Sequence, residues 1–128
     1  MFKTDTVRCR VIGAGVSVPP RAVPGGFILQ ASTMEPLVLM PDTRLALSVG
    51  VSIDVPRGYE ASIRPHPRLA TNEGVTVEGA PVTLGLGQHL LRVTLINRGP
   101  QAVKIRSGDP VGLLLVRNAS VVRLAWEV

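Results

Sequence analysis

A long stretch of two-residue alternation near the middle of the chain constrains the fold most. Small or polar residues stand between six apolar ones, which are Leu45, Leu47, Val49, Val51, Ile53 and Val55. Successive side chains of a β-strand point to opposite faces of the sheet. The pattern therefore predicts one strand over residues 45–55 with a single face in the core.

Thirteen glycines and eleven prolines divide the rest of the chain into short segments. Between them, apolar or alternating stretches predict strands at residues 1–12, 27–29, 37–40, 59–64, 75–78, 91–95, 103–106, 111–116 and 121–128. The continuous apolar run at 111–116 predicts a strand that is buried on both faces. No segment predicts a helix, and residues 13–26 are expected to form a loop.

The composition agrees with an all-β fold. The 128 residues fit one domain, expected to span residues 1–128. Hydrophobic residues make up 45% of the chain but aromatic residues only 3%, so the core must consist of Val, Leu, Ile and Ala. Branched side chains of this kind favour the pleated sheet. We expect a single domain of about eight or more short strands.

The charge limits the classes of partner. Two of the 14 basic residues are lysines, so the other twelve are arginines, and the net charge is +5. Arginine forms bidentate pairs with carboxylates and phosphates, which favours interfaces. The basic residues are scattered and have no aromatic residues between them, so nucleic acid is not expected as a partner. The sequence shows no apolar run of membrane-spanning length and no signal-peptide pattern, so neither a membrane position nor secretion is expected.

Five segments resemble, in order, the motifs of the trimeric dUTPase family, which is related to the dCTP deaminases. They are residues 26–29, 48–60, 65–75, 95–97 and 107–114. Gly26-Phe27-Ile28-Leu29 stands in place of Gly-Tyr-Asp-Leu, and Pro65-His66-Pro67-Arg68-Leu69-Ala70 in place of Pro-Arg-Ser-Gly-Leu-Ala. The resemblance implies a dUTPase-like jelly roll or distorted β-barrel that forms a homotrimer.

The same resemblance marks departures at positions that the family uses for catalysis. Ile28 replaces an aspartate, and Pro67 replaces the serine of the phosphate-binding element. Leu84 and Gly87 stand where the family has the carboxylate that orients water and the tyrosine that stacks on the sugar. Losing one positioned polar contact lowers a rate by about 10²–10³. The replacements predict that the chain is not an enzyme, with no catalytic residue.

The sequence-based hypothesis is therefore a non-catalytic structural or binding trimer, such as a phage capsid decoration, cement or spike-base protein. Scattered arginines suit docking onto an acidic capsid or another protein partner. Two alternatives stay open, a regulatory relative that binds nucleotide without hydrolysis and a diverged dUTP or dCTP nucleotidohydrolase. The expected location is the virion for a phage protein and otherwise the cytoplasm.

A small basic cluster is the candidate contact site. Arg64, His66 and Arg68 stand where the family binds phosphate, and His89 is the second histidine of the chain. These four residues are candidate contacts for an anion or a partner, and the alternative interpretation is a solvated loop. No second His, Cys or carboxylate stands at ligand spacing from either histidine, so no metal site and no cofactor is expected.

Overall fold

The computed structural model describes residues 6–12, 19–119 and 123–127. Its elements are β1 (Arg8–Val11), β2 (Arg21–Val23), β3 (Gly26–Gln30), β4 (Leu37–Leu39), β5 (Arg44–Val55), β6 (Tyr59–Arg64), α1 (Pro67–Glu73), β7 (Val75–Val77), β8 (Val82–Leu84), β9 (Gly87–Asn97), β10 (Val103–Ile105) and β11 (Pro110–Asn118). The predicted all-β class is confirmed.

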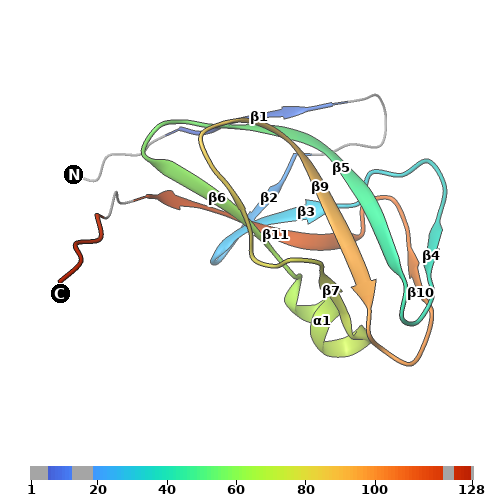
Figure 1. Ribbon diagram of the computed structural model, residues 1–128. Helices are drawn as coiled ribbons and strands as arrows, with labels where there is room; N and C mark the ends of the chain where they lie inside the picture. Colours follow the sequence, from blue (N-terminus) through green and yellow to red (C-terminus); the bar gives the residue numbers. More distant parts are fainter. Residues whose placement is uncertain (1–5, 13–18, 120–122, 128) are drawn as a thin grey trace.

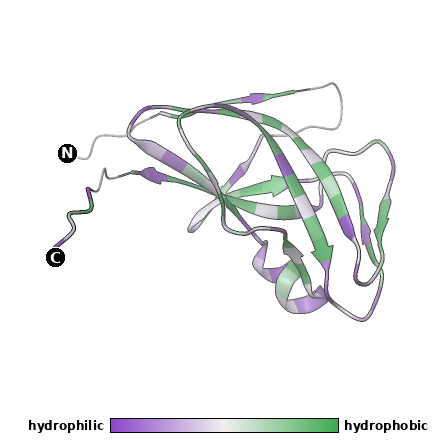
Figure 2. Ribbon diagram, viewed as in Figure 1, coloured by the Kyte–Doolittle hydropathy of each residue, from purple (hydrophilic) through white to green (hydrophobic). Residues whose placement is uncertain are grey.

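Two antiparallel sheets face each other. One has the strand order β1-β5-β9-β7 and the other the order β2-β3-β11-β6-β8. Figure 1 shows the first sheet above the second, with the β4–β10 ribbon at one end and α1 beneath β7. The hydropathy colours of Figure 2 show apolar stretches along β5, β9 and β11. Apolar side chains from both sheets form one buried cluster between the layers.

Strand β5 confirms the alternation. The buried apolar residues of this strand are Leu47, Val49, Val51, Ile53 and Val55. Its pairing with β9 shifts register between Ser48 and Ser52, where Gly50 has φ 66° and its N–H donates to Ser48 Oγ at 3.0 Å. A bulge of this kind bends a strand, and glycine tolerates the positive φ that it requires.

Strand β11 lies between β3 and β6, in the middle of its sheet. Val111 and Leu114 are buried, whereas Leu113, Leu115 and Val116 are half-buried. The prediction of burial on both faces of 111–116 is therefore only partly right. Leu113 and Leu115 are on the face of β11 that points away from the core, so their side chains are partly exposed.

The sequence predicted no helix, and that was wrong. In the described part of the chain α1 is the only helix, and no helix there is long and apolar enough to cross a membrane. Pro67 is its first residue, and Gly74 ends it with φ 71° while donating its N–H to Ala70 O at 3.2 Å. None of its residues is buried. A helix without a buried face leaves no apolar periodicity to detect.

Two short strands were also missed and one predicted strand is not found. Strand β2 lies inside the predicted loop 13–26, and β8 lies in a segment with no predicted strand. Residues 123–127 contain no strand, while 1–5, 13–18, 120–122 and 128 lie outside the described residues. Both missed strands lie between prolines and glycines, which led to their segments being predicted as loops.

Candidate functional site

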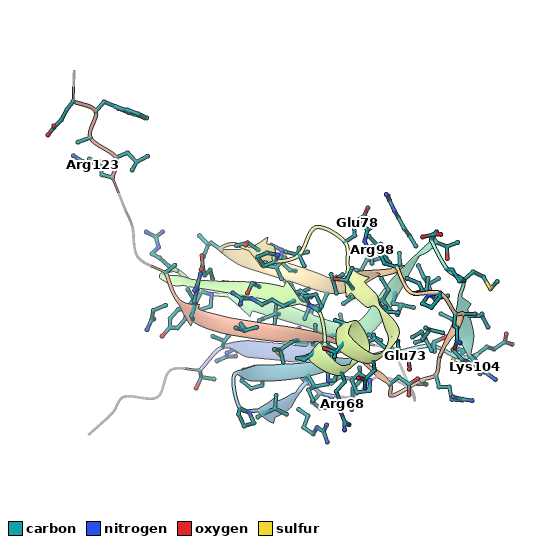
Figure 3. The ribbon with its side chains drawn as sticks, turned by 90° about the horizontal axis from the view of Figure 1, so that it is seen from below. Arg68, Glu73, Glu78, Arg98, Lys104 and Arg123 are labelled. Atoms are coloured by element: carbon teal, nitrogen blue, oxygen red, sulfur yellow. The ribbon has the colours of Figure 1, made fainter. Side chains whose placement is uncertain are left out.

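A cavity of about 430 Å³ lies beside α1, and we call it the basic groove. The polar side chains that line it are Arg21, His66, Arg68, Asn72, Glu73, Lys104 and Asp109. Four of them are basic and two are carboxylates. Figure 3 shows Arg68 and Glu73 beside α1 and Lys104 farther toward the end of the molecule. Clustered cations of this kind attract an anion.

The basic groove gathers residues from distant parts of the chain. Arg21 belongs to β2 and pairs with Ile28 of β3, which places it beside the buried floor of the groove. Lys104 belongs to β10, which pairs with β4 at the end of the sandwich. The remaining charged side chains come from α1 and from the turn before β11. Only the packing of these elements brings the charges together.

His66 lies immediately before α1 and its side chain does not cap the helix. Burial lowers the pKa of His66 below its ordinary value of 6.5, and the positive charges of Arg68 and Arg21 lower it further. The imidazole is therefore held in its neutral form near neutral pH. A bound anion would reverse this effect, because negative charge favours the imidazolium.

Asp109 is fixed by its own turn. Its Oδ2 accepts the backbone N–H of Arg106 at 2.7 Å, and its own N–H donates to Arg106 O at 3.0 Å. The carbonyl of Asp109 accepts the N–H of Ala31 at 2.8 Å, which ties the turn to the end of β3. Glu73, by contrast, is an exposed residue at the end of α1. The groove thus has one restrained carboxylate and one exposed carboxylate.

The structure separates the predicted cluster. His66 and Arg68 line the basic groove together, but Arg64 lines a second cavity with Arg44 and Arg98. His89 lines neither of these two cavities, and its Nε2 donates to Gly85 O at 2.8 Å across the turn that joins β8 to β9.

Sequence reasoning missed Arg21, Lys104 and Glu73 as members of the site. Arg21 and Lys104 are far from His66 along the chain, and the pairing of β2 with β3 was not predicted. Glu73 is close to Arg68 in sequence, but both belong to α1, the helix that was not predicted. Among the residues that the structure describes, no group of three His, Cys, Asp or Glu side chains could hold a metal ion.

The four replaced positions lie in different places. Ile28 is buried and lines the groove, and Pro67 is the exposed first residue of α1. Leu84 on β8 and Gly87 at the start of β9 are not among the residues that line the groove. Only one of the four side chains therefore contributes to the cavity that holds the charges.

Relatives of the chain share its sequence over nearly its full length. No family model matches it. The deoxyuridine 5'-triphosphate nucleotidohydrolase of Anaplasma marginale is 36% identical over 130 residues, covering 99% of this chain and 86% of the relative. The enzyme of the same name from Nocardia farcinica is 33% identical over 124 residues, covering 95% of this chain and 75% of the relative.

Solved structures support the fold. The dUTPase of Staphylococcus bacteriophage 80alpha, solved with dUpNHpp, matches with a TM-score of 0.81 at 13% identity and covers 97% of each chain. A dUTPase from phage phi11 of S. aureus matches with a TM-score of 0.78 at 14% identity, covering 96% of this chain and 97% of that one. At such identity the likeness shows the architecture alone.

The prediction of a non-enzymatic structural protein is wrong, and so is its assignment to capsid decoration. The curated relatives that share 33–36% of their residues with this chain are named as nucleotide hydrolases. The prediction judged four motif positions one at a time, at Ile28, Pro67, Leu84 and Gly87. It could not take into account the charged side chains that other segments bring to the groove.

Proposed function

This chain belongs to the dUTPase family, and from that premise we propose that it binds dUTP in the basic groove and hydrolyses it. The name of its relatives supports the substrate. The single structural observation behind the proposal is the grouping of four basic side chains with two carboxylates in one cavity. Phosphoryl transfer depends mainly on positioning and on neutralising charge, and this set of residues can do both.

The basic side chains would hold the phosphates. Arg21 and Arg68 each present a planar fork of donors that fits two phosphate oxygens at once. Lys104 of β10 also lines the groove and adds a compact charge. His66 donates a ring N–H, and it gains a proton more readily once the anion is bound. These contacts bind the triphosphate and withdraw charge from the phosphorus under attack.

The carboxylates would act on the water. Glu73 is the exposed carboxylate of the groove, so it can accept the proton of a water molecule that attacks the α-phosphorus. The new P–O bond forms as the bond to the bridging oxygen breaks, and pyrophosphate leaves with the electron pair. Asp109, held by its turn, adds a second and restrained negative charge to the groove.

We further propose that the protein is a homotrimer, as the family resemblance implies. Large apolar side chains are exposed on the chain by itself, with Met34, Leu86 and Trp126 exposed to 84%, 66% and 89%. Side chains of this size are commonly covered by a neighbouring subunit. Sedimentation equilibrium of the full chain tests the proposal, and a monomer at micromolar concentration would contradict it.

Measured pyrophosphate release from dUTP tests the activity, with dCTP, dTTP and UTP as competing substrates. We expect turnover of dUTP and a loss of about 10²-fold or more in kcat for Glu73→Gln, with dUTP affinity nearly unchanged. Arg92→Gln, an exposed change outside the groove, is the matched control. Binding of dUTP without any pyrophosphate release by the parent protein would refute hydrolysis.

A further inference from the structure

A second cavity, of about 570 Å³, lies beside β7, the edge strand of the β1-β5-β9-β7 sheet. Three arginines line it. They are Arg44, the first residue of β5, Arg64, the last residue of β6, and Arg98, which directly follows β9. We call it the arginine pocket. None of the residues that the structure describes lines both this pocket and the basic groove. In Figure 3, Arg98 lies beside Glu78 and away from Arg68 and Lys104.

The strand register explains how the pocket is built. Arg44 and Thr76 both pair with Ile96, so the three residues form one row across the sheet. Their neighbours Leu45 and Leu95 belong to the core or pack against it, so the row itself points to the outer face. This row therefore supplies one wall of the pocket, and Arg64 at the end of β6 reaches the pocket from the other sheet.

Ile96 lies on this outer face, yet it is only 9% exposed. A side chain on the outside of a sheet can be this buried only when other side chains cover it. The residues that line the pocket with Ile96 include the three arginines, whose aliphatic stems can pack on apolar surface while their guanidinium groups stay in contact with water. Packing of these stems over Ile96 would account for its burial.

The charges in the pocket are only partly balanced. Arg44 Nη1 lies 2.7 Å from Glu78 Oε1. Within the described residues, neither Arg64 nor Arg98 has a carboxylate within ion-pair distance. Two guanidinium groups therefore stay without a negative partner in one concavity, a condition that attracts an anion.

We propose that the arginine pocket binds a phosphate dianion, either as free phosphate or as the phosphate group of a small molecule. Two unneutralised arginines match the charge of a dianion, and their forks match its oxygens. Ala80 and Pro81 also line the pocket and can contact the organic part of a phosphate ester. This site does not depend on dUTP hydrolysis in the basic groove.

Calorimetric titration of the full chain with inorganic phosphate at alkaline pH tests the proposal. The basic groove could also bind phosphate, so the titrations use Arg68→Gln/Lys104→Gln as the background. We expect Arg64→Gln/Arg98→Gln to weaken phosphate binding about tenfold or more, because two charge-assisted contacts are lost. Arg92→Gln removes a comparable exposed arginine from β9 and should leave the affinity unchanged.

A second variant should change the affinity for phosphate in the opposite direction. Among the described residues that line the pocket, Glu78 is the one carboxylate. Glu78→Gln removes it and releases Arg44, so phosphate should bind about threefold tighter. Circular dichroism checks the fold of every variant, and Arg98→Gln alone replaces the double variant if that one unfolds. The proposal is overturned if phosphate does not bind to the background protein. It is also overturned if the pocket variants behave like Arg92→Gln, or if Glu78→Gln weakens binding.

Discussion

The basic groove and the arginine pocket flank one short segment of chain but are built in different ways. Arg64 and Pro65 line the pocket, whereas His66, the next residue, lines the groove. One wall of the pocket is a row across a regular sheet, while the groove is assembled from α1, the turn before β11 and residues of β2, β3 and β10. The groove contains a titratable histidine and an exposed carboxylate, and the pocket contains permanently charged arginines.

That difference separates two kinds of anion site. Arginine does not release its proton near neutral pH, so the pocket can hold a negative charge but cannot exchange protons with a ligand through its arginines. His66 and Glu73 give the groove groups that can move a proton. The two regions touch where Arg98 N–H donates to Gly74 O at 2.9 Å, directly after the last residue of α1.

The variant with the largest expected effect tests whether the basic groove supports the activity. Arg68→Gln/Lys104→Gln should lower kcat/KM for dUTP about 10²–10³-fold, because the groove would lose two of the charges that stabilise the transition state. Steady-state pyrophosphate release measures it. Arg57→Gln/Arg92→Gln removes two exposed arginines outside both cavities and serves as the control. Equal losses in both double variants would mean that general surface charge, and not the groove, supports activity.

The next largest effect concerns the turn that presents Arg98. Asn97 is fully buried, its Nδ2 donates to Leu39 O at 3.0 Å and Gln101 O at 2.7 Å, and its Oδ1 accepts Gly99 N–H at 2.9 Å. Asn97→Ala would leave these buried groups unpaired and should lower the free energy of unfolding by about 2–4 kcal/mol. Urea denaturation measures the change. The exposed Asn118→Ala is the control, and a similar small loss in both would contradict this role.

A third variant acts on the contact between the two regions. A Cβ at Gly99 would collide with the carbonyl oxygen of Glu73, the last residue of α1. Gly99→Ala should therefore cost about 1–3 kcal/mol of unfolding free energy and weaken dUTP turnover and phosphate binding together. Gly85→Ala, where a Cβ would meet nothing within 4 Å, is the matched control. If Gly99→Ala weakens only dUTP turnover or only phosphate binding, the contact does not couple the groove to the pocket.

The smallest effect is a pH dependence that belongs to the groove. The pKa of His66 is lowered in the folded chain, so the unfolded chain binds the proton more tightly. The contribution of His66 to stability is complete above its ordinary pKa of 6.5 and is lost as the pH falls through the lowered value.

Unfolding free energies at about pH 5 and about pH 8 measure this contribution. His66→Asn should reduce the gain in unfolding free energy from the lower pH to the higher pH, while His89→Asn should leave this gain unchanged. A gain that survives His66→Asn unchanged would remove His66 as its source.

The long strands could be predicted from the sequence because their patterns are local. The alternation at 45–55 and 91–95 matches β5 and β9, since a period of two residues is a direct result of strand geometry. Helix α1 could have been found from Pro67 at its start and Gly74 at its end, the usual residues at those positions. Its lack of a buried face hid it from any test of apolar periodicity.

The candidate site was only partly predictable. His66 and Arg68 were identified because they stand in a motif that resembles a phosphate-binding element. Arg21 and Lys104 could not be added, because β2 and β10 reach α1 only through the pairing of β2 with β3 and of β10 with β4. The prediction against catalysis failed for the same reason, since it judged single positions without the charges around them.

Alternation, glycine, proline and the scarcity of aromatic side chains determined that this chain forms short strands around an aliphatic core. Those features act between residues a few positions apart, so the order of the amino acids is enough to reveal them. The tertiary structure alone decided that Arg64 and His66 face different cavities and which distant charges each one meets. Electrostatic interaction depends on distance through space, and distance through space is settled only when the sheets have packed.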